Sequence, residues 1–163
     1  PYSFFGIGKF ESSGKFNVEG NIMSLIYGDN FIGKTDLSGK DYVFINLFSG
    51  DANLIGAENL ILPATTLSYM CYSGLFYNCT KLETAPVLSA TTLANACYMS
   101  LFQECTSLNS ITCLATDISA QDCTTSWVKN VASSGTFYKN PSMSSWTSGK
   151  DGIPTNWTVT NYS

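Results

Sequence analysis

Cysteine is the residue type whose spacing first suggests chemistry in this chain. Cys71 and Cys79 are eight residues apart, and Cys97 and Cys105 repeat that spacing. On a helix this is about two turns, or about 12 Å, which is too far for a disulfide or for one shared zinc ion. The pattern therefore favours a ladder of small buried thiols, with one rung for each repeat.

Cys113 and Cys123 are placed less regularly than the other cysteines. A disulfide that involves one of them therefore stays an alternative. Metal binding is a weaker alternative, so no metal ligand is predicted.

Other catalytic groups are scarce. The 163 residues include no His, the eight cations are all Lys, and the net charge is −4. Without His there is no Ser-His-Asp or Cys-His catalysis, and no Asp/Glu pair recurs on one face as a glycosidase requires. We predict no enzyme activity, no catalytic residues and no cofactor. The missing Arg and the acidic balance argue against nucleic acid as a partner, and no apolar run approaches the about 20 residues of a membrane helix.

The elements that must position any site form an internal repeat. The segment from Leu62 to Leu82 aligns without gaps with the segment from Leu88 to Leu108. A degraded copy follows at the same period, and an upstream copy fits with two extra residues. About four stacked coils result, which predicts a solenoid.

Each repeat divides into two parts. Apolar residues at 67, 71, 75, 76 and 79 have the spacing of a helical face, so we expect a short helix over 67–79 and its equivalents. The stretches 82–87, 108–113 and 134–139 are typical of the short strands of leucine-rich repeats. The sequence thus predicts an α/β repeat: a right-handed, leucine-rich-repeat-like solenoid with a short parallel β-sheet, short helices and a β-hairpin N-terminal cap.

The flanks differ from the repeats. Weak alternation at Phe5/Ile7 and Phe16/Val18 predicts a β-hairpin over 2–27. We therefore divide the chain into an N-terminal β cap (1–40), coils (41–139) and a polar C-terminal cap (140–163) that ends in a strand over 157–162. The chain begins at Pro1 rather than Met, which indicates a processed or excised piece.

Candidate ligand contacts lie where the repeats differ or where strand residues point outward. Tyr72, Tyr98, Phe76 and Phe102 recur in phase and are predicted to be core. For the residues outside the apolar face of 67–79, two interpretations are open: a binding surface, or scattered surface aromatics without a partner. On the strands, uncharged residues alternate with the inward set and would suit sugar hydroxyls or an extended peptide. The candidate contacts are Tyr69, Met70, Tyr77, Thr84, Pro86, Ser110 and Thr112.

The tandem unit Leu-Pro-Ala-Thr-Thr-Leu, followed by Cys-Tyr-x-x-Leu-Phe-x-x-Cys-Thr-x-Leu, resembles the BspA-like leucine-rich repeat proteins of bacterial cell surfaces. The resemblance covers about residues 20–160. It implies an exported, surface-exposed or extracellular protein that adheres to host matrix, other cells or glycans, with a protein or glycan ligand as its partner. A phage virion component, structural or receptor-binding, in a fibre or decoration protein, is the alternative that it also suggests.

Overall fold

The computed structural model describes residues 8–163, and its main element is one parallel β-sheet. The six strands are hydrogen-bonded in sequence order, and each pair is parallel. The strands are β1 (Phe16–Asn21), β2 (Leu54–Ile61), β3 (Thr84–Leu88), β4 (Ser110–Cys113), β5 (Thr136–Lys139) and β6 (Thr158–Asn161). Helix is confined, among the described residues, to α1 (Ser24–Tyr27) and the short 3-10 helix η1 (Gly28–Asn30).

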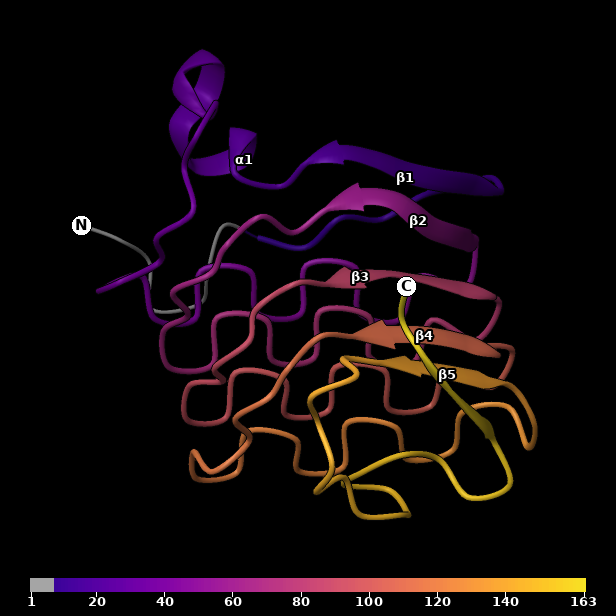
Figure 1. Cartoon of the computed structure of the whole chain (residues 1–163). Coiled ribbons are helices and arrows are strands. Elements are labelled where there is room, and N and C mark those ends of the chain that lie inside the picture. Colours follow the sequence, from indigo (N-terminus) through magenta and orange to yellow (C-terminus); the bar gives the residue numbers. More distant parts are fainter. Residues whose placement is uncertain (1–7) are drawn as a thin grey trace.

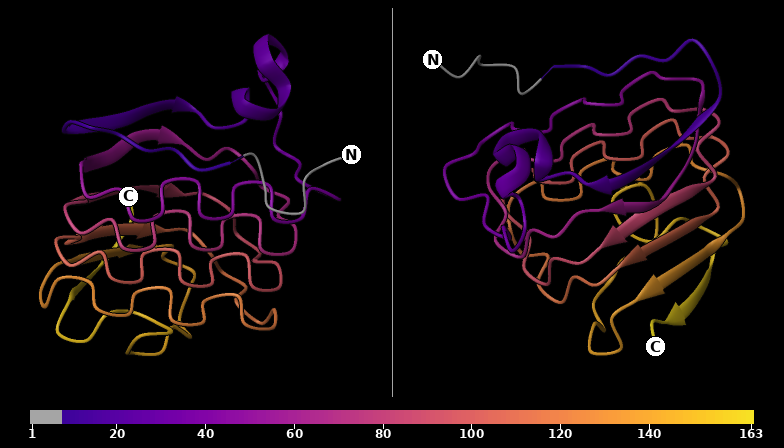
Figure 2. Two further views of the ribbon diagram at one scale, coloured as in Figure 1. Left: turned by 180° about the vertical axis from the view of Figure 1, so that it is seen from behind. Right: turned by 90° about the horizontal axis from the view of Figure 1, so that it is seen from above.

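The chain winds as a solenoid of about four turns (Figure 1). Each strand of the sheet is reached from the previous one by a winding segment that forms the opposite wall (Figure 2). The predicted strands over 82–87, 108–113 and 134–139 correspond to β3, β4 and β5. The solenoid and its parallel sheet are therefore confirmed.

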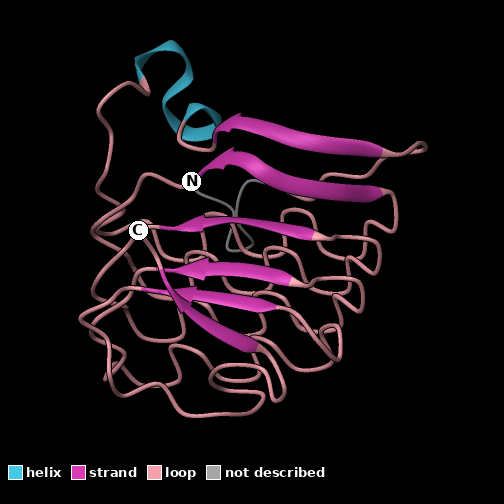
Figure 3. Cartoon of the chain, turned by 45° about the vertical axis from the view of Figure 1, so that its right-hand side comes forward, coloured by secondary structure: helices cyan, strands magenta, loops and turns pink. Residues whose placement is uncertain are grey.

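The segment 67–79 is a ribbon of tight turns, so the predicted helix is wrong. Alternate amides close turns within the coil, such as the Leu75 N–H that donates to the Tyr72 carbonyl (3.1 Å). The amides between them donate to the next coil, such as the Phe76 N–H to the Leu101 carbonyl (3.0 Å). The equivalent segments of the other coils have the same pattern, and we call this wall of the solenoid the turn ribbon (Figure 3).

A left-handed backbone conformation at every fourth residue explains why the turn ribbon is not helical. Met70, Gly74 and Asn78 have φ of 52°, 61° and 57°, a left-handed conformation that interrupts a right-handed helix each time it occurs. Hydrogen bonds to the next coil offset the strain at the non-glycine positions. In a segment as short as 67–79, apolar positions spaced by four closely resemble the period of an α-helix, and the helix prediction failed for this reason.

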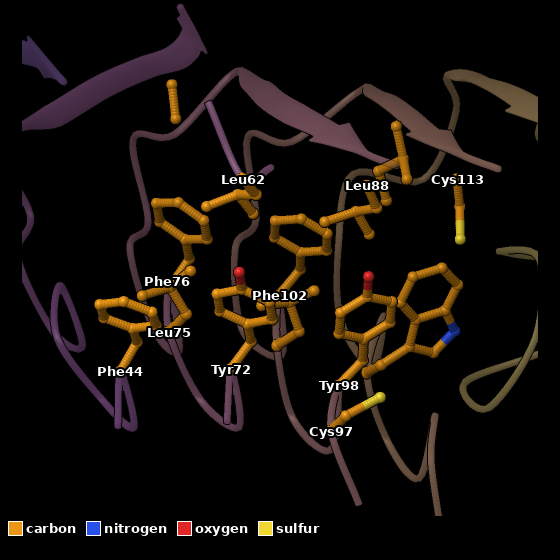
Figure 4. Close-up of a cluster of buried hydrophobic side chains, with 14 of the residues drawn as sticks. Phe44, Leu62, Tyr72, Leu75, Phe76, Leu88, Cys97, Tyr98, Phe102 and Cys113 are labelled. Atoms are coloured by element: carbon orange, nitrogen blue, oxygen red, sulfur yellow. The ribbon is translucent and has the colours of Figure 1, made fainter. Parts of the chain in front are cut away.

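The core lies between the sheet and the turn ribbon, as two rows of stacked rings (Figure 4). In one row, Phe76 stacks on Phe102 with ring centroids 5.7 Å apart and an interplanar angle of 12°. In the other, Tyr72 lies between Phe44 (5.6 Å) and Tyr98 (6.2 Å). All five rings are buried, so one repeat packs on the next through identical positions.

The N-terminal segment is another parallel strand, so the predicted β-hairpin is wrong for the described residues. Phe16 of β1 pairs with Leu54 of β2, and β1 extends the sheet by one strand. An alternation such as Phe16/Val18 marks a half-buried strand but does not specify the direction of its neighbour. Phe5 and Ile7, which belonged to the same prediction, lie outside the described residues.

The C-terminal segment lies along the last turn ribbon before it forms β6. Trp146 stacks on Trp127 (5.4 Å, 6°), and the Trp127 Nε1 donates to the Gly152 carbonyl (2.8 Å). The Val128 N–H donates to the Lys150 carbonyl (3.2 Å). This carbonyl replaces the acceptor that the next coil supplies to equivalent amides elsewhere in the turn ribbon. The predicted last strand is confirmed as β6, and all four of its residues are exposed.

Candidate functional site

The exposed edge of the turn ribbon carries the first group of candidate residues. Tyr69 is 43% exposed and Met70 is partly buried. Tyr77 is 37% exposed but lies eight residues further along, at the other end of the ribbon. Tyr69 and Tyr77 therefore do not share one site, and the prediction that these residues contact a ligand stays a prediction.

Tyr69 has an aromatic partner that the sequence interpretation missed. The ring of Tyr42 meets it edge to face, with centroids 5.3 Å apart at 88°. The Tyr42 N–H also donates to the Tyr69 carbonyl (3.0 Å), so a backbone hydrogen bond fixes the spacing of the two residues. Partial desolvation, together with Tyr69 and Asp41, raises the pKa of Tyr42 above its usual value. The Tyr42 hydroxyl is therefore neutral at physiological pH.

A third ring extends this group. Tyr27, in α1, has the Lys40 Nζ 5.3 Å and the Lys34 Nζ 5.2 Å from its ring centroid. Lys40 lies two residues before Tyr42, and its carbonyl accepts a hydrogen bond from the Ser68 hydroxyl (2.9 Å). We call Tyr27, Lys40, Tyr42 and Tyr69 the aromatic cluster. Its sequence signals were Tyr27, which lies in the segment assigned to the hairpin, and Tyr42, which precedes the repeated positions Val43 and Phe44 of the first coil.

The outer face of the sheet carries the second group of candidate residues. Ile111 and Cys113 of β4 are buried, so Ser110 and Thr112, which alternate with them, face outward. Ser110 pairs with Thr84 of β3 on one side and with Thr136 of β5 on the other. The sheet thus aligns three side-chain hydroxyls in one row.

Pro86 does not lie on this face, so its predicted placement is wrong. Thr84 pairs with Ser110, but Val87 rather than Pro86 pairs with Thr112. The extra residue is a β-bulge, which shifts the in-out alternation of β3. Pro86 is consequently buried and Val87 only partly buried.

The thiols take no part in either surface. All six cysteines are free and buried, and they include the four cysteines of the predicted ladder. The Cys79 Sγ donates to the Phe48 carbonyl (3.0 Å) and the Cys105 Sγ to the Phe76 carbonyl (2.9 Å), so each thiol is tied to the preceding coil. Burial raises the pKa of Cys71 and Cys113 to about 12, which leaves no reactive thiolate near neutral pH.

Within residues 8–163, no three cysteine or acidic side chains come together as a metal site. In the same part of the chain, no helix has the length and apolar character needed to cross a membrane. Comparisons with protein-family models, with curated proteins and with solved structures gave no match.

Proposed function

We propose that this chain is a non-enzymatic binding module that holds a protein or glycan ligand of another surface at the aromatic cluster. The edge-to-face pair of Tyr42 and Tyr69 carries the proposal. Tyrosine offers a large, rigid contact area with a polar tip, which suits both protein epitopes and sugar rings. Lys40 adds one cation to the cluster, over the ring of Tyr27.

The scaffold makes such a site rigid before the ligand arrives. Tyr42 and Tyr69 belong to successive coils, and cross-coil hydrogen bonds join their backbones along the whole ribbon. Binding to a preorganised site costs less conformational entropy than binding to a mobile loop. A repetitive solenoid that carries the aromatic cluster on its surface fits adhesion better than turnover of a substrate.

We propose that the chain belongs with the BspA-like leucine-rich repeat proteins, as an exported module of a bacterial surface. Support comes from the tandem unit, each copy of which forms one coil with a strand on one wall. Residues 140–163 would then serve as the C-terminal cap, since Trp146 covers Trp127 at the end of the core.

The test is a binding screen of the purified chain against glycans and matrix proteins. We expect Tyr69→Ser to weaken binding of the ligand found by at least tenfold, because central aromatic residues dominate such interfaces. The melting temperature should fall by only a few degrees, since Tyr69 is 43% exposed and loses one edge-to-face contact, worth about 0.5–1.5 kcal/mol. Tyr77→Ser is the matched control, because Tyr77 is similarly exposed at the far end of the ribbon. A ligand that binds both variants as tightly as the parent chain would contradict the site.

A further inference from the structure

Three side-chain oxygens from three neighbouring strands converge over Gly56. A Cβ atom at this position would lie 2.5 Å from Glu58 Oε2 and 3.2 Å from both Asn17 Oδ1 and Thr84 Oγ1. The register places Gly56 between Asn17 of β1 and Thr84 of β3. We call these four residues the Gly56 cradle, and only a glycine at its floor leaves room for all three oxygens.

The cradle has the polarity of a site for hydroxyl donors. The Thr84 hydroxyl donates to Glu58 Oε2 (2.5 Å), and this hydrogen bond lowers the pKa of Glu58, so the carboxylate stays ionised at neutral pH. Glu58 and Asn17 both present acceptor oxygens at an exposed surface. Two acceptors over one glycine match a pair of neighbouring hydroxyl groups on a ligand.

The cradle begins a longer row of hydroxyls across the outer face of the sheet. Thr84 pairs with Ser110, Ser110 with Thr136, and Thr136 with Thr158. The separation between neighbouring strands is about 4.8 Å. Each hydroxyl can donate and accept. A cationic peptide would find no carboxylate among Ser110, Thr136 and Thr158, whereas a chain of neutral sugars would find matching groups along the whole row.

We propose that the Gly56 cradle and the hydroxyl row bind a neutral polysaccharide, with two adjacent sugar hydroxyls donating to Glu58 and Asn17. This inference rests on the proposed binding function and names a ligand class for it. It adds a site on the sheet, on the wall of the solenoid opposite the turn ribbon.

Gly56→Ala is the most selective variant. Its φ is not in the left-handed region, and the atoms that the new methyl group meets are the ends of side chains, which can swing away. The fold should therefore survive while the cradle is filled. Gly14→Ala is the matched control, because Gly14 also lacks a positive φ and has nothing within 4 Å of its Cβ position.

The measurement is the dissociation constant for dextran, mannan and xylan, with oligolysine as a cationic probe. We expect the parent chain and Gly14→Ala to bind at least one of the three polysaccharides equally, and Gly56→Ala to bind it at least tenfold more weakly at an unchanged melting temperature. If Gly56→Ala is destabilised, Glu58→Gln and Thr136→Val should each weaken binding severalfold in a folded chain.

Three results would overturn the inference: no neutral polysaccharide binds the parent chain, the cradle variants bind as the parent does, or oligolysine is the ligand that Glu58→Gln loses. The Tyr69→Ser variant separates this failure from failure of the proposed function. A ligand that is lost with Tyr69→Ser but kept with Gly56→Ala would leave the aromatic cluster standing and remove the cradle.

Discussion

The free energy of unfolding should fall steeply above about pH 9, because burial holds protons on thiols that the unfolded chain releases. Unfolded thiols titrate near about 8.5, whereas burial raises their pKa values in the folded chain. The pKa rises to about 12 for Cys71, Cys79 and Cys113, and it is also raised for Cys97, Cys105 and Cys123. Above about pH 8.5 the unfolded state therefore binds fewer protons, and stability falls as pH rises.

The size of this effect follows from the number of thiols. Each one contributes about 1.4 kcal/mol per pH unit between its unfolded and folded pKa values. Whole domains are stable by only about 5–15 kcal/mol, so the buried thiols together should bring unfolding within two pH units. Tyr72 and Tyr98, whose pKa values burial also raises, add to the loss at higher pH.

Chemical denaturation at pH 7 to 11, with a reductant present, measures this dependence. We expect a nearly constant free energy of unfolding up to pH 8 and a fall to near zero by about pH 10.5. Cys113→Ala should reduce the slope of this fall by the share of one proton, about 1.4 kcal/mol per pH unit, because it removes one buried thiol. A free energy that stays level from pH 8 to 10.5 would show that the thiols are not buried as described.

Phe102→Ala should destabilise the chain by about 3–5 kcal/mol, the usual cost of truncating a buried phenylalanine. Phe102 is fully buried, stacks on Phe76 and also contacts Trp127 (6.4 Å), so the change opens a cavity in the middle of the ring row. At about 2–4 °C per kcal/mol for a domain of this size, the melting temperature should fall by roughly 10 °C.

Phe48→Ala is the matched comparison, because Phe48 occupies the same position in the first coil and stacks on Phe76 from the other side (5.5 Å). Phe48 is 5% exposed and borders a cavity of about 540 Å³, so it loses fewer contacts when truncated. We expect a clearly smaller loss there, measured as the fall in melting temperature. Equal losses at both positions would contradict a core whose centre is the middle coils.

The stacking of coils could be predicted from sequence because it depends on which positions recur. Phe76 and Phe102 occupy the same place in successive copies, and they are each other's neighbours in the core. The local conformation was harder to predict, because apolar spacing reports only which side of a segment is buried. The glycine and asparagine at 74 and 78, both with positive φ, were the signal against a helix.

The sites were less predictable, because they join residues far apart in the sequence. Tyr42 reaches Tyr69 from the neighbouring coil, and Tyr27 comes from a segment outside the repeat. The burial of Pro86 depends on one extra residue in β3, and the Gly56 cradle on the register of three strands. Neither can be derived from periodicity alone.

The central claim is that each coil of the turn ribbon is hydrogen-bonded to the next, and NMR couplings across hydrogen bonds test it most directly. The structure predicts couplings from the amide nitrogens of Gly74, Phe76 and Asn78 to the carbonyl carbons of Met99, Leu101 and Gln103, because these groups are 2.9, 3.0 and 2.7 Å apart from donor to acceptor. Couplings from each of these amides to the carbonyl four residues before it would instead show a helix and contradict the solenoid described here.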